Sequence, residues 1–269
     1  TDALIPRLGG PMGRHALRVG PWFIPLPWAV LVAAGLFSVL FLRHVPCLQT
    51  DADDVVNSYI RACYSDLQPI FLGEGLGLGG SPLTSAQMTL PPLLAVLVLA
   101  CRAVAVALGA PVGVGATMQE QVDASVVFFA VTTVALFACF LVVVLCVGRL
   151  GRGHTRAPSW DALLVAGSPI VLAVGLIDWT LMPLALTAVG LVLLFRGAVV
   201  PGAIVLGLAA SAGTMPIAVV LAVVVAVGLR RGWRTATTVS VGAAASFLLV
   251  HAPLLVSDAE PGRSELAVS

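Results

Sequence analysis

The chain has 269 residues, of which 59% are hydrophobic and 10% are charged, and its formal net charge is +1. A soluble domain of this size cannot bury so much apolar surface, so the composition excludes a soluble fold and predicts an all-α, polytopic membrane protein. All 14 basic residues are arginine, which excludes lysine-dependent chemistry such as Schiff-base formation or P-loop phosphate binding. The four histidines lack metal-ligand spacing, and no nucleic-acid partner is expected.

Eight apolar runs follow one another along the chain. Several of them reach the roughly 20 residues that a helix needs to cross a bilayer. The first run is too long for a signal peptide and lacks a small-residue cleavage site. The runs cover residues 22–42, 90–110, 125–147, 160–177, 179–195, 199–212, 215–229 and 237–256.

The charges between these runs indicate a topology, because arginine and lysine concentrate in short cytoplasmic loops. Arginine clusters lie before residue 22 and at 149–156, with others at 196 and 230–234, whereas acidic clusters lie at 51–74, 120–123 and 258–265. With a cytoplasmic N-terminus, residues 51–74 lie outside. Two full crossings after them would place the arginine cluster at 149–156 outside as well. We therefore expect the run 90–110, which starts with a proline pair and carries Arg102, to be an outer juxtamembrane or re-entrant helix. Eight crossings with a broken charge rule are the alternative.

This topology predicts about seven transmembrane helices in a cell membrane. Residues 1–21 form a cytoplasmic tail, residues 22–256 the transmembrane module, and residues 257–269 an outer C-terminal segment. A large first outer loop spans residues 43–124 and includes the helix at 90–110. Trp160 and Asp161 fit an anchor at the inner interface, with an acid in the first helical turn.

Three polar side chains and one helix break fall on the outer side in this topology. They are Asp66, Asp178, His251 and the sequence GTMP at 213–216. Short membrane helices interrupted by glycine and proline occur where they line a cavity or pack against protein. The sequence therefore predicts a site that faces the outside.

Cys47 and Cys63 lie 16 residues apart in the first outer loop. The outer surface of a membrane is oxidising, so a disulfide that closes this loop is a candidate. The other three cysteines lie in apolar runs, where we expect small buried hydrophobic side chains.

A series of segments occurs in a fixed order: CYSDLQPIF and GEGL within residues 63–76, LPPLLA at 90–95, PSWDALLVAGSPIVLAVGLIDWTLMPLALTAVGLVLL at 158–194, and GAIVLGLAASAGTMPIAVVL at 202–221. This series resembles actinobacterial polytopic glycosyltransferases of the GT-C fold. The resemblance is in particular to glycosyltransferase family 87, the polyprenyl-phosphate-mannose-dependent mannosyltransferases. It covers about residues 47–234.

The resemblance implies a seven-helix GT-C-like module and a lipid-phosphate sugar that enters from the membrane. It implies Asp66 as the catalytic base and Asp178 as a group that helps to hold phosphate, metal or acceptor. The implied reaction moves a sugar, mannose in that family, to an envelope glycolipid or polysaccharide on the outer face. The alternative for Asp66 is to cap the short helix expected to follow it.

Three features differ from the family pattern. Thr89 and Leu90 precede the proline pair where the family has an acidic or aromatic residue, and GTMP stands where it has lysine-x-Tyr-Pro. The chain also ends soon after the seventh expected helix. These differences leave three alternatives open: a truncated chain, a half that needs a partner membrane protein for further helices, and a non-catalytic subunit or scaffold.

Further side chains are candidates for substrate binding. Arg61 and Arg102 could replace the missing lysine at the lipid phosphate, because arginine binds phosphate well; the alternatives are a solvated loop charge for Arg61 and snorkelling to the headgroups for Arg102. Tyr64 and His251 are candidates for substrate contact, and Tyr64 could instead cover the juxtamembrane helix. Transfer from a lipid phosphate requires no nucleotide site and no cofactor, although a divalent cation is compatible with the acidic groups.

Overall fold

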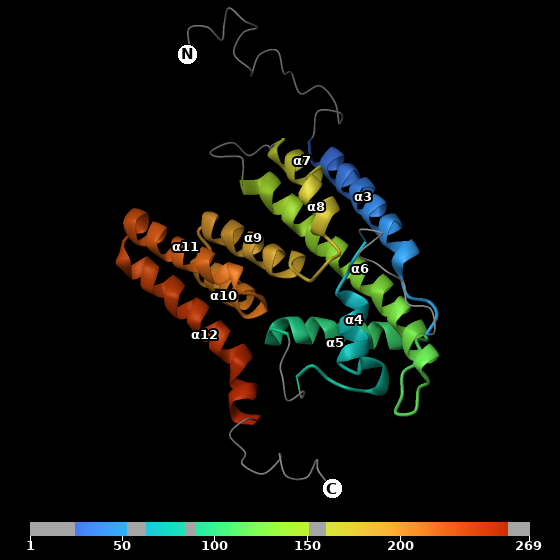
Figure 1. Cartoon of the computed structure of the whole chain (residues 1–269). Coiled ribbons are helices and arrows are strands. Elements are labelled where there is room, and N and C mark those ends of the chain that lie inside the picture. The colour runs from blue at the N-terminus through green and yellow to red at the C-terminus, as the bar shows by residue number, and fades with distance from the viewer. Residues whose placement is uncertain (1–24, 53–62, 84–89, 151–159, 258–269) are drawn as a thin grey trace, which may run out of the picture.

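The structure, a computed structural model, describes residues 25–52, 63–83, 90–150 and 160–257, and every regular element within these ranges is a helix (Figure 1). The elements are α3 (Pro25–His44), η2 (Val45–Cys47), α4 (Leu67–Gly73), η3 (Leu76–Leu78), α5 (Pro92–Ala107), α6 (Met118–Leu150), α7 (Asp161–Ala166), α8 (Pro169–Val174), α9 (Leu181–Phe195), α10 (Val199–Ala212), α11 (Met215–Arg231) and α12 (Trp233–Ser257).

Seven of the eight apolar runs each correspond to one helix, and the run 160–177 is divided into two. The single span expected there is interrupted between α7 and α8. Ser168 has an extended backbone with ψ 123°, because the ring of the following Pro169 disfavours the helical conformation for the residue before it. The chain then restarts as a helix with proline in its first turn.

Three helices are long and apolar enough to cross a membrane, by length and composition: Pro25–Cys47, Met118–Leu150 and Trp233–Ala252. Other apolar helices are shorter, at 10–17 residues. A helix of 15 residues is only about 22 Å long, compared with about 30 Å for a bilayer core. The helices therefore support a membrane protein with both long and short apolar segments.

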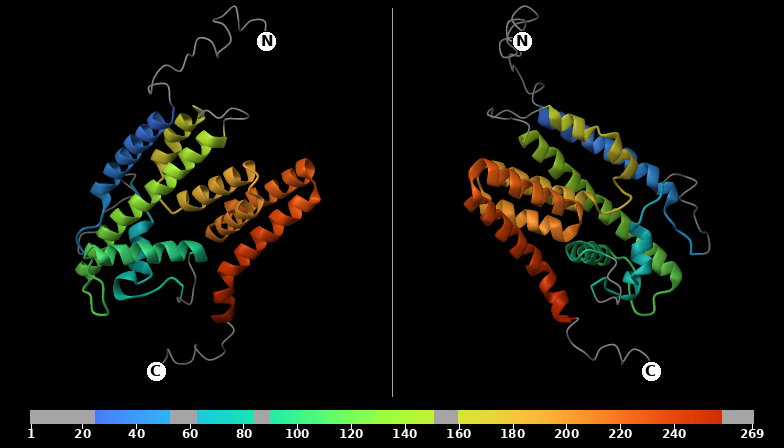
Figure 2. Two further views of the ribbon diagram at one scale, coloured as in Figure 1. Left: turned by 180° about the vertical axis from the view of Figure 1, so that it is seen from behind. Right: turned by 60° about the vertical axis from the view of Figure 1, so that its left-hand side comes forward.

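The helices form two groups that meet along α9 (Figures 1 and 2). In the first group, α3, α6, α7 and α8 lie side by side, while α4 and α5 pack near the beginning of α6. In the second group, α10 packs between α9 and α12, and α11 packs against α10 and α12. This arrangement leaves the start of α9 facing α4 and α5.

An apolar core lies within each of the two groups, and a small third cluster of Cys146, Ala188 and Val192 joins α6 to α9. The larger core joins the helices from α3 to α8 and contains the buried aromatic side chains of Phe37, Phe128 and Trp179. The smaller core joins α9, α10 and α12 through Leu194, Ala203, Leu206 and Val239. Tight packing of α4 and of the segment before α9 against the larger core fixes the region in which the candidate site lies.

Candidate functional site

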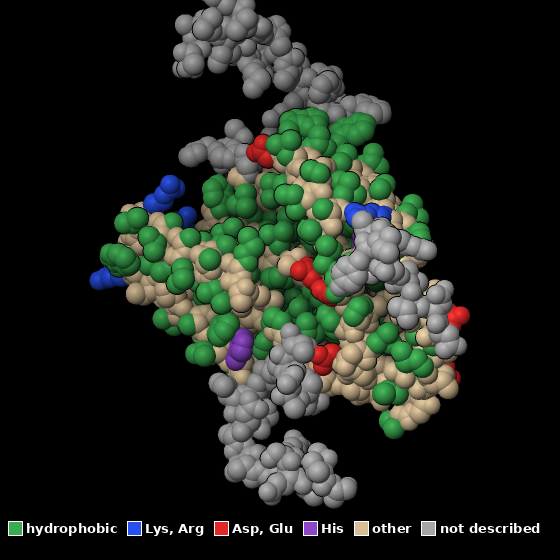
Figure 3. All heavy atoms as spheres, in the orientation of Figure 1, with side chains coloured by type: hydrophobic (Ala, Val, Ile, Leu, Met, Phe, Trp, Pro, Cys, Tyr) green, Lys and Arg blue, Asp and Glu red, His purple; other side chains and the backbone are tan. Residues whose placement is uncertain are grey.

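A cavity of about 470 Å³ lies where segments that are distant in sequence come together. Its walls are the start of α4, the start of α5, the start of α9, and the junction between α10 and α11. In Figure 3, acidic side chains lie within a hollow of mainly apolar surface. The lining residues are Asp66, Ile70, Leu90, Pro91, Leu94, Asp178, Trp179, Thr180, Pro183, Leu184, Thr187, Ala212, Gly213, Thr214, Met215, Pro216 and Val219.

Asp66 reaches this cavity because its own backbone is tied to the segment that carries Asp178. The amide of Asp66 donates to the carbonyl oxygen of Ile177 at 2.7 Å. The hydroxyl of Ser65 donates to the carbonyl oxygen of Leu176 at 2.6 Å. These two hydrogen bonds join positions 111 residues apart and bring the two acidic residues to one cavity.

The carboxylate of Asp66 is not used to cap a helix. Asp66 precedes α4, but its side chain makes no capping hydrogen bond and its backbone is helical, with φ −79° and ψ −8°. Its Oδ1 instead accepts a hydrogen bond from the hydroxyl of Tyr64. The capping alternative therefore fails for this side chain, and Tyr64 contacts the acidic group.

Asp178 has a different local support. Its Oδ1 accepts hydrogen bonds from the backbone amide of Thr180 at 2.9 Å and from the Thr180 hydroxyl at 2.5 Å. This short turn places the carboxylate one turn before α9, where the partial positive charge of the helix N-terminus favours an anion. Asp178 is half-buried and lines the cavity.

Aromatic packing holds both acidic segments against α6. The ring of Phe128 lies 4.9 Å from that of Phe71 in α4 and 6.0 Å from that of Trp179. All three side chains are buried. Because Trp179 directly follows Asp178, this row of rings fixes the turn before α9 and the start of α4 to the same point on α6.

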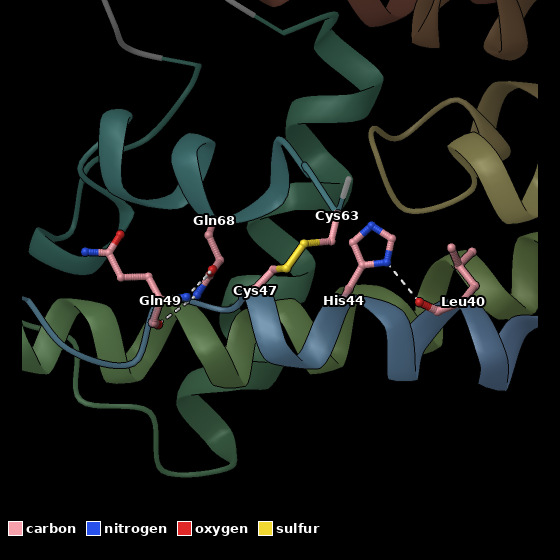
Figure 4. The surroundings of a disulfide bond; sticks show 6 residues. All are labelled: Leu40, His44, Cys47, Gln49, Cys63 and Gln68. Carbon is pink, nitrogen blue, oxygen red and sulfur yellow. Dashed lines mark hydrogen bonds between the residues drawn. A yellow bond between two sulfur atoms is a disulfide. The ribbon is translucent and has the colours of Figure 1, made fainter. Parts of the chain in front are cut away.

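The segment around Asp66 is also fastened to the end of α3 (Figure 4). The structure contains the disulfide between Cys47 and Cys63 that the sequence suggested, with the Cα atoms 6.2 Å apart. Gln68 adds hydrogen bonds to the backbone of Gln49 and, through Nε2, to the hydroxyl of Ser125 at 2.9 Å. The acidic group of Asp66 is therefore carried by a segment that is attached on three sides.

The other sequence-predicted site residues lie outside the cavity lining or outside the described residues. Arg102 donates from Nε to the carbonyl oxygen of Leu76 at 2.8 Å and does not line the cavity. His251 in α12 donates from Nδ1 to the carbonyl oxygen of Phe247, one turn earlier in the same helix, and does not line the cavity. Arg61 lies outside the described residues. Among the described candidates for substrate contact, Tyr64 is the one that hydrogen-bonds to an acidic group of the cavity.

Three hydroxyl-bearing residues of the cavity were missed by sequence analysis: Thr180, Thr187 and Thr214. Thr180 had a usable signal, because a hydroxyl two residues after an aspartate is typical of a turn that the carboxylate stabilises. Thr214 lies in the break that the sequence did identify. Among the described residues, no group of three or more histidine, cysteine, aspartate or glutamate side chains is arranged to hold a metal ion, so a cation here would depend on the two carboxylates and these hydroxyls.

Comparison of the chain with protein-family models, with curated proteins and with solved structures finds no match.

Proposed function

We propose that the chain is a membrane glycosyltransferase that moves a sugar from a polyprenyl phosphate to an envelope glycan or glycolipid on the outer face. The observation that carries this proposal is the convergence of Asp66 and Asp178 on one cavity of about 470 Å³. The cavity is mainly apolar apart from these carboxylates and the threonines. Such a site suits a substrate that combines a hydroxyl-rich sugar with a lipid chain.

The proposed reaction needs one base at the acceptor. The oxygen of an acceptor hydroxyl forms a bond to the anomeric carbon, while the bond from that carbon to the phosphate oxygen breaks and its electron pair stays on the phosphate. The hydroxyl proton passes to the Asp66 carboxylate. Tyr64, which donates to Oδ1 of Asp66, orients that carboxylate so that its other oxygen can accept the proton.

Helix ends support the leaving phosphate in this proposal. The helices α5, α9 and α11 all begin at or directly after residues that line the cavity. Each helix N-terminus carries roughly half a positive charge and offers backbone N–H groups, which favours a phosphate group. These dipoles could take over part of the task that a lysine or arginine would perform.

One observation favours a second function, a non-catalytic GT-C-like subunit that needs a partner chain. Among the described residues, none that lines the cavity is an arginine or a histidine. A site for a lipid phosphate normally places a cation beside the leaving group. On this alternative, a partner membrane protein would supply the missing cation together with further helices.

The path of the chain supports about seven crossings with a cytoplasmic N-terminus. In this proposal the seven crossings are α3, α6, the pair α7 and α8, and then α9, α10, α11 and α12. Both ends of α5 stay beside the α4 region, since its start lines the cavity and Gly113, just after it, donates to the carbonyl oxygen of Gly77 at 3.0 Å. We therefore propose α5 as the outer juxtamembrane or re-entrant helix, with the cavity opening outside.

The test is sugar transfer by the purified protein with a polyprenyl-phosphate mannose donor and an extract of envelope lipids as acceptor. Asp66→Asn should lower the rate on the order of 10²–10⁴-fold, the usual contribution of a general base, and Asp178→Asn should also impair transfer. Asp123→Asn is the matched control, because Asp123 is exposed, accepts from Gln119 and does not line the cavity.

The outcomes separate the two functions. Transfer that is unchanged in both cavity variants would rule out Asp66 and Asp178 as reacting groups. A wild-type chain that transfers no sugar alone, but does so with a co-purified membrane protein, would establish the subunit function instead.

A further inference from the structure

A second groove lies at the opposite ends of α9 and α11 from the cavity. It has a volume of about 360 Å³ and runs between the last residues of α6, α9 and α11. Its walls are apolar, with Leu191 and Phe195 from α9 facing Val223 and Val227 from α11. Two charged residues, Arg230 and Arg231, complete the lining at the end of α11.

Arginines at neighbouring helix ends contribute positive charge around this groove. Arg149 lies in the last turn of α6, and Arg196 directly follows α9. Arg231 donates from a guanidinium nitrogen to the carbonyl oxygen of Leu194 at 3.3 Å. In Figure 3, basic side chains gather at the tip of the molecule where Figure 1 places the junction of α11 and α12.

Helix dipoles do not neutralise this charge. Each helix C-terminus contributes roughly half a negative charge, so the ends of α6, α9 and α11 together offset about one and a half of the four guanidinium charges. Arg230 and Arg231 are exposed, and no acidic residue is among the described residues that line the groove. A net positive rim therefore borders an apolar channel between helices.

This combination fits a ligand with an anionic head and a hydrocarbon chain. A guanidinium group binds phosphate oxygens through several N–H donors, and basic pockets between membrane helices on the cytoplasmic side bind anionic lipid headgroups. A free phosphate would leave the apolar walls uncovered, whereas a neutral lipid would leave the arginines without a counter-charge.

We propose that this groove is a binding site for an anionic phospholipid of the inner leaflet, with its phosphate on Arg230 and Arg231 and one acyl chain between α9 and α11. The site is separate from the cavity that holds Asp66 and Asp178, and it does not depend on sugar transfer. The bound lipid bridges the ends of α9 and α11, which stabilises the second group of helices.

The experiment uses the purified full chain in a neutral detergent, and measures bound lipid by native mass spectrometry and the thermal unfolding temperature. The probes are dioleoyl phosphatidylglycerol, dioleoyl phosphatidylcholine, dioleoylglycerol and inorganic phosphate. Phosphatidylglycerol should be retained and should raise the unfolding temperature, and both effects should weaken at high salt. The other three probes should have much smaller effects.

Two variants test the two halves of the groove. Arg230→Gln should weaken retention of phosphatidylglycerol about fivefold, the effect expected for one arginine near an anionic lipid headgroup. Ala226→Phe keeps every charge but fills the apolar part of the groove, so it should also reduce retention. Arg234→Gln is the matched control, because Arg234 is exposed, lies in the same charged segment and does not line the groove.

Equal retention of phosphatidylcholine and phosphatidylglycerol would overturn the proposal, because it would indicate ordinary lipid surrounding the protein. Equal loss in Arg230→Gln and Arg234→Gln would overturn it as well, since only the overall charge would then matter. Stabilisation by inorganic phosphate that matches phosphatidylglycerol would replace the lipid site with a site for a free anion.

Discussion

Gly207 lies where α10 and α12 approach most closely. A Cβ atom added at this position would overlap the backbone carbonyl of Ala243 and the hydroxyl of Ser246. That hydroxyl lies 3.0 Å from the carbonyl oxygen of Ile204 in α10 and 3.0 Å from that of Gly242 in its own helix, so the two helices are in contact here. The close approach requires a residue without a side chain, because the obstacle is backbone that cannot move aside by a rotamer change.

We therefore expect Gly207→Ala to lower the free energy of unfolding by about 1–3 kcal/mol, the usual range for overpacking a tight contact. The measurement is denaturant or thermal unfolding in one detergent. Gly35→Ala is the control, because Gly35 lies in α3 with open space around it, where alanine should be neutral or stabilising. Equal destabilisation by the two changes would contradict the assigned contact between α10 and α12.

At the scale of elements, the segment from Cys47 to Cys63 behaves as a closed loop on the end of α3. The chain has five cysteines, and Cys101, Cys139 and Cys146 are free. We expect alkylation of the denatured, unreduced protein to modify three thiols, and alkylation after reduction to modify five, as counted by intact mass. Modification of five thiols without reduction would show that the loop is open.

Reduction should also have an energetic effect. Closing a loop of this size removes conformations from the unfolded chain and contributes about 3 kcal/mol. Cys63→Ser should therefore lower the unfolding temperature and increase proteolysis of the segment that carries Asp66. Cys139→Ser is the matched control, since that thiol is free.

The elements show what the sequence could predict. The apolar runs located the helices well, because hydrophobic length is a local property: the run 199–212 coincides with α10. The interruption of the helix at residue 168 was not predicted, because a proline within an apolar run is compatible with either a kink or a new helix.

The site was predictable only in part. Asp66, Asp178 and the break at 213–216 could be selected as acids and a helix interruption in outer segments. The hydrogen bond from Asp66 to Ile177 could not be predicted, since it depends on how α4 packs against α6. Arg102 and His251 each hydrogen-bond to a backbone carbonyl group. The sequence alone does not distinguish a side chain that binds a backbone carbonyl group from one that binds a substrate phosphate.

At the scale of the whole molecule, the two ends of the helices differ in character. The end with the cavity carries Asp66, Asp178, Glu120 and Asp123, with Arg102 nearby, whereas the ends of α6, α9 and α11 carry arginines, with Asp161 at the start of α7 beside the end of α6. The helices α9, α10 and α11 have 14–17 residues and are too short to span a bilayer alone. Short helices of this kind are tolerated where they pack against protein or line a cavity, as α9, α10 and α11 do at the cavity.

This polarity predicts which surfaces face each side of the membrane. Val114 follows α5 and is 94% exposed, so Val114→Cys should react with a membrane-impermeant maleimide in intact cells. Arg234→Cys, at the start of α12, should react only after the membrane is permeabilised, because arginine-rich ends remain on the cytoplasmic side. The parent chain is the control, since its three free cysteines lie within helices. If both positions were labelled from the same side, the chain would cross the membrane an even number of times between α5 and α12. The proposal of an outward-facing cavity would then be wrong.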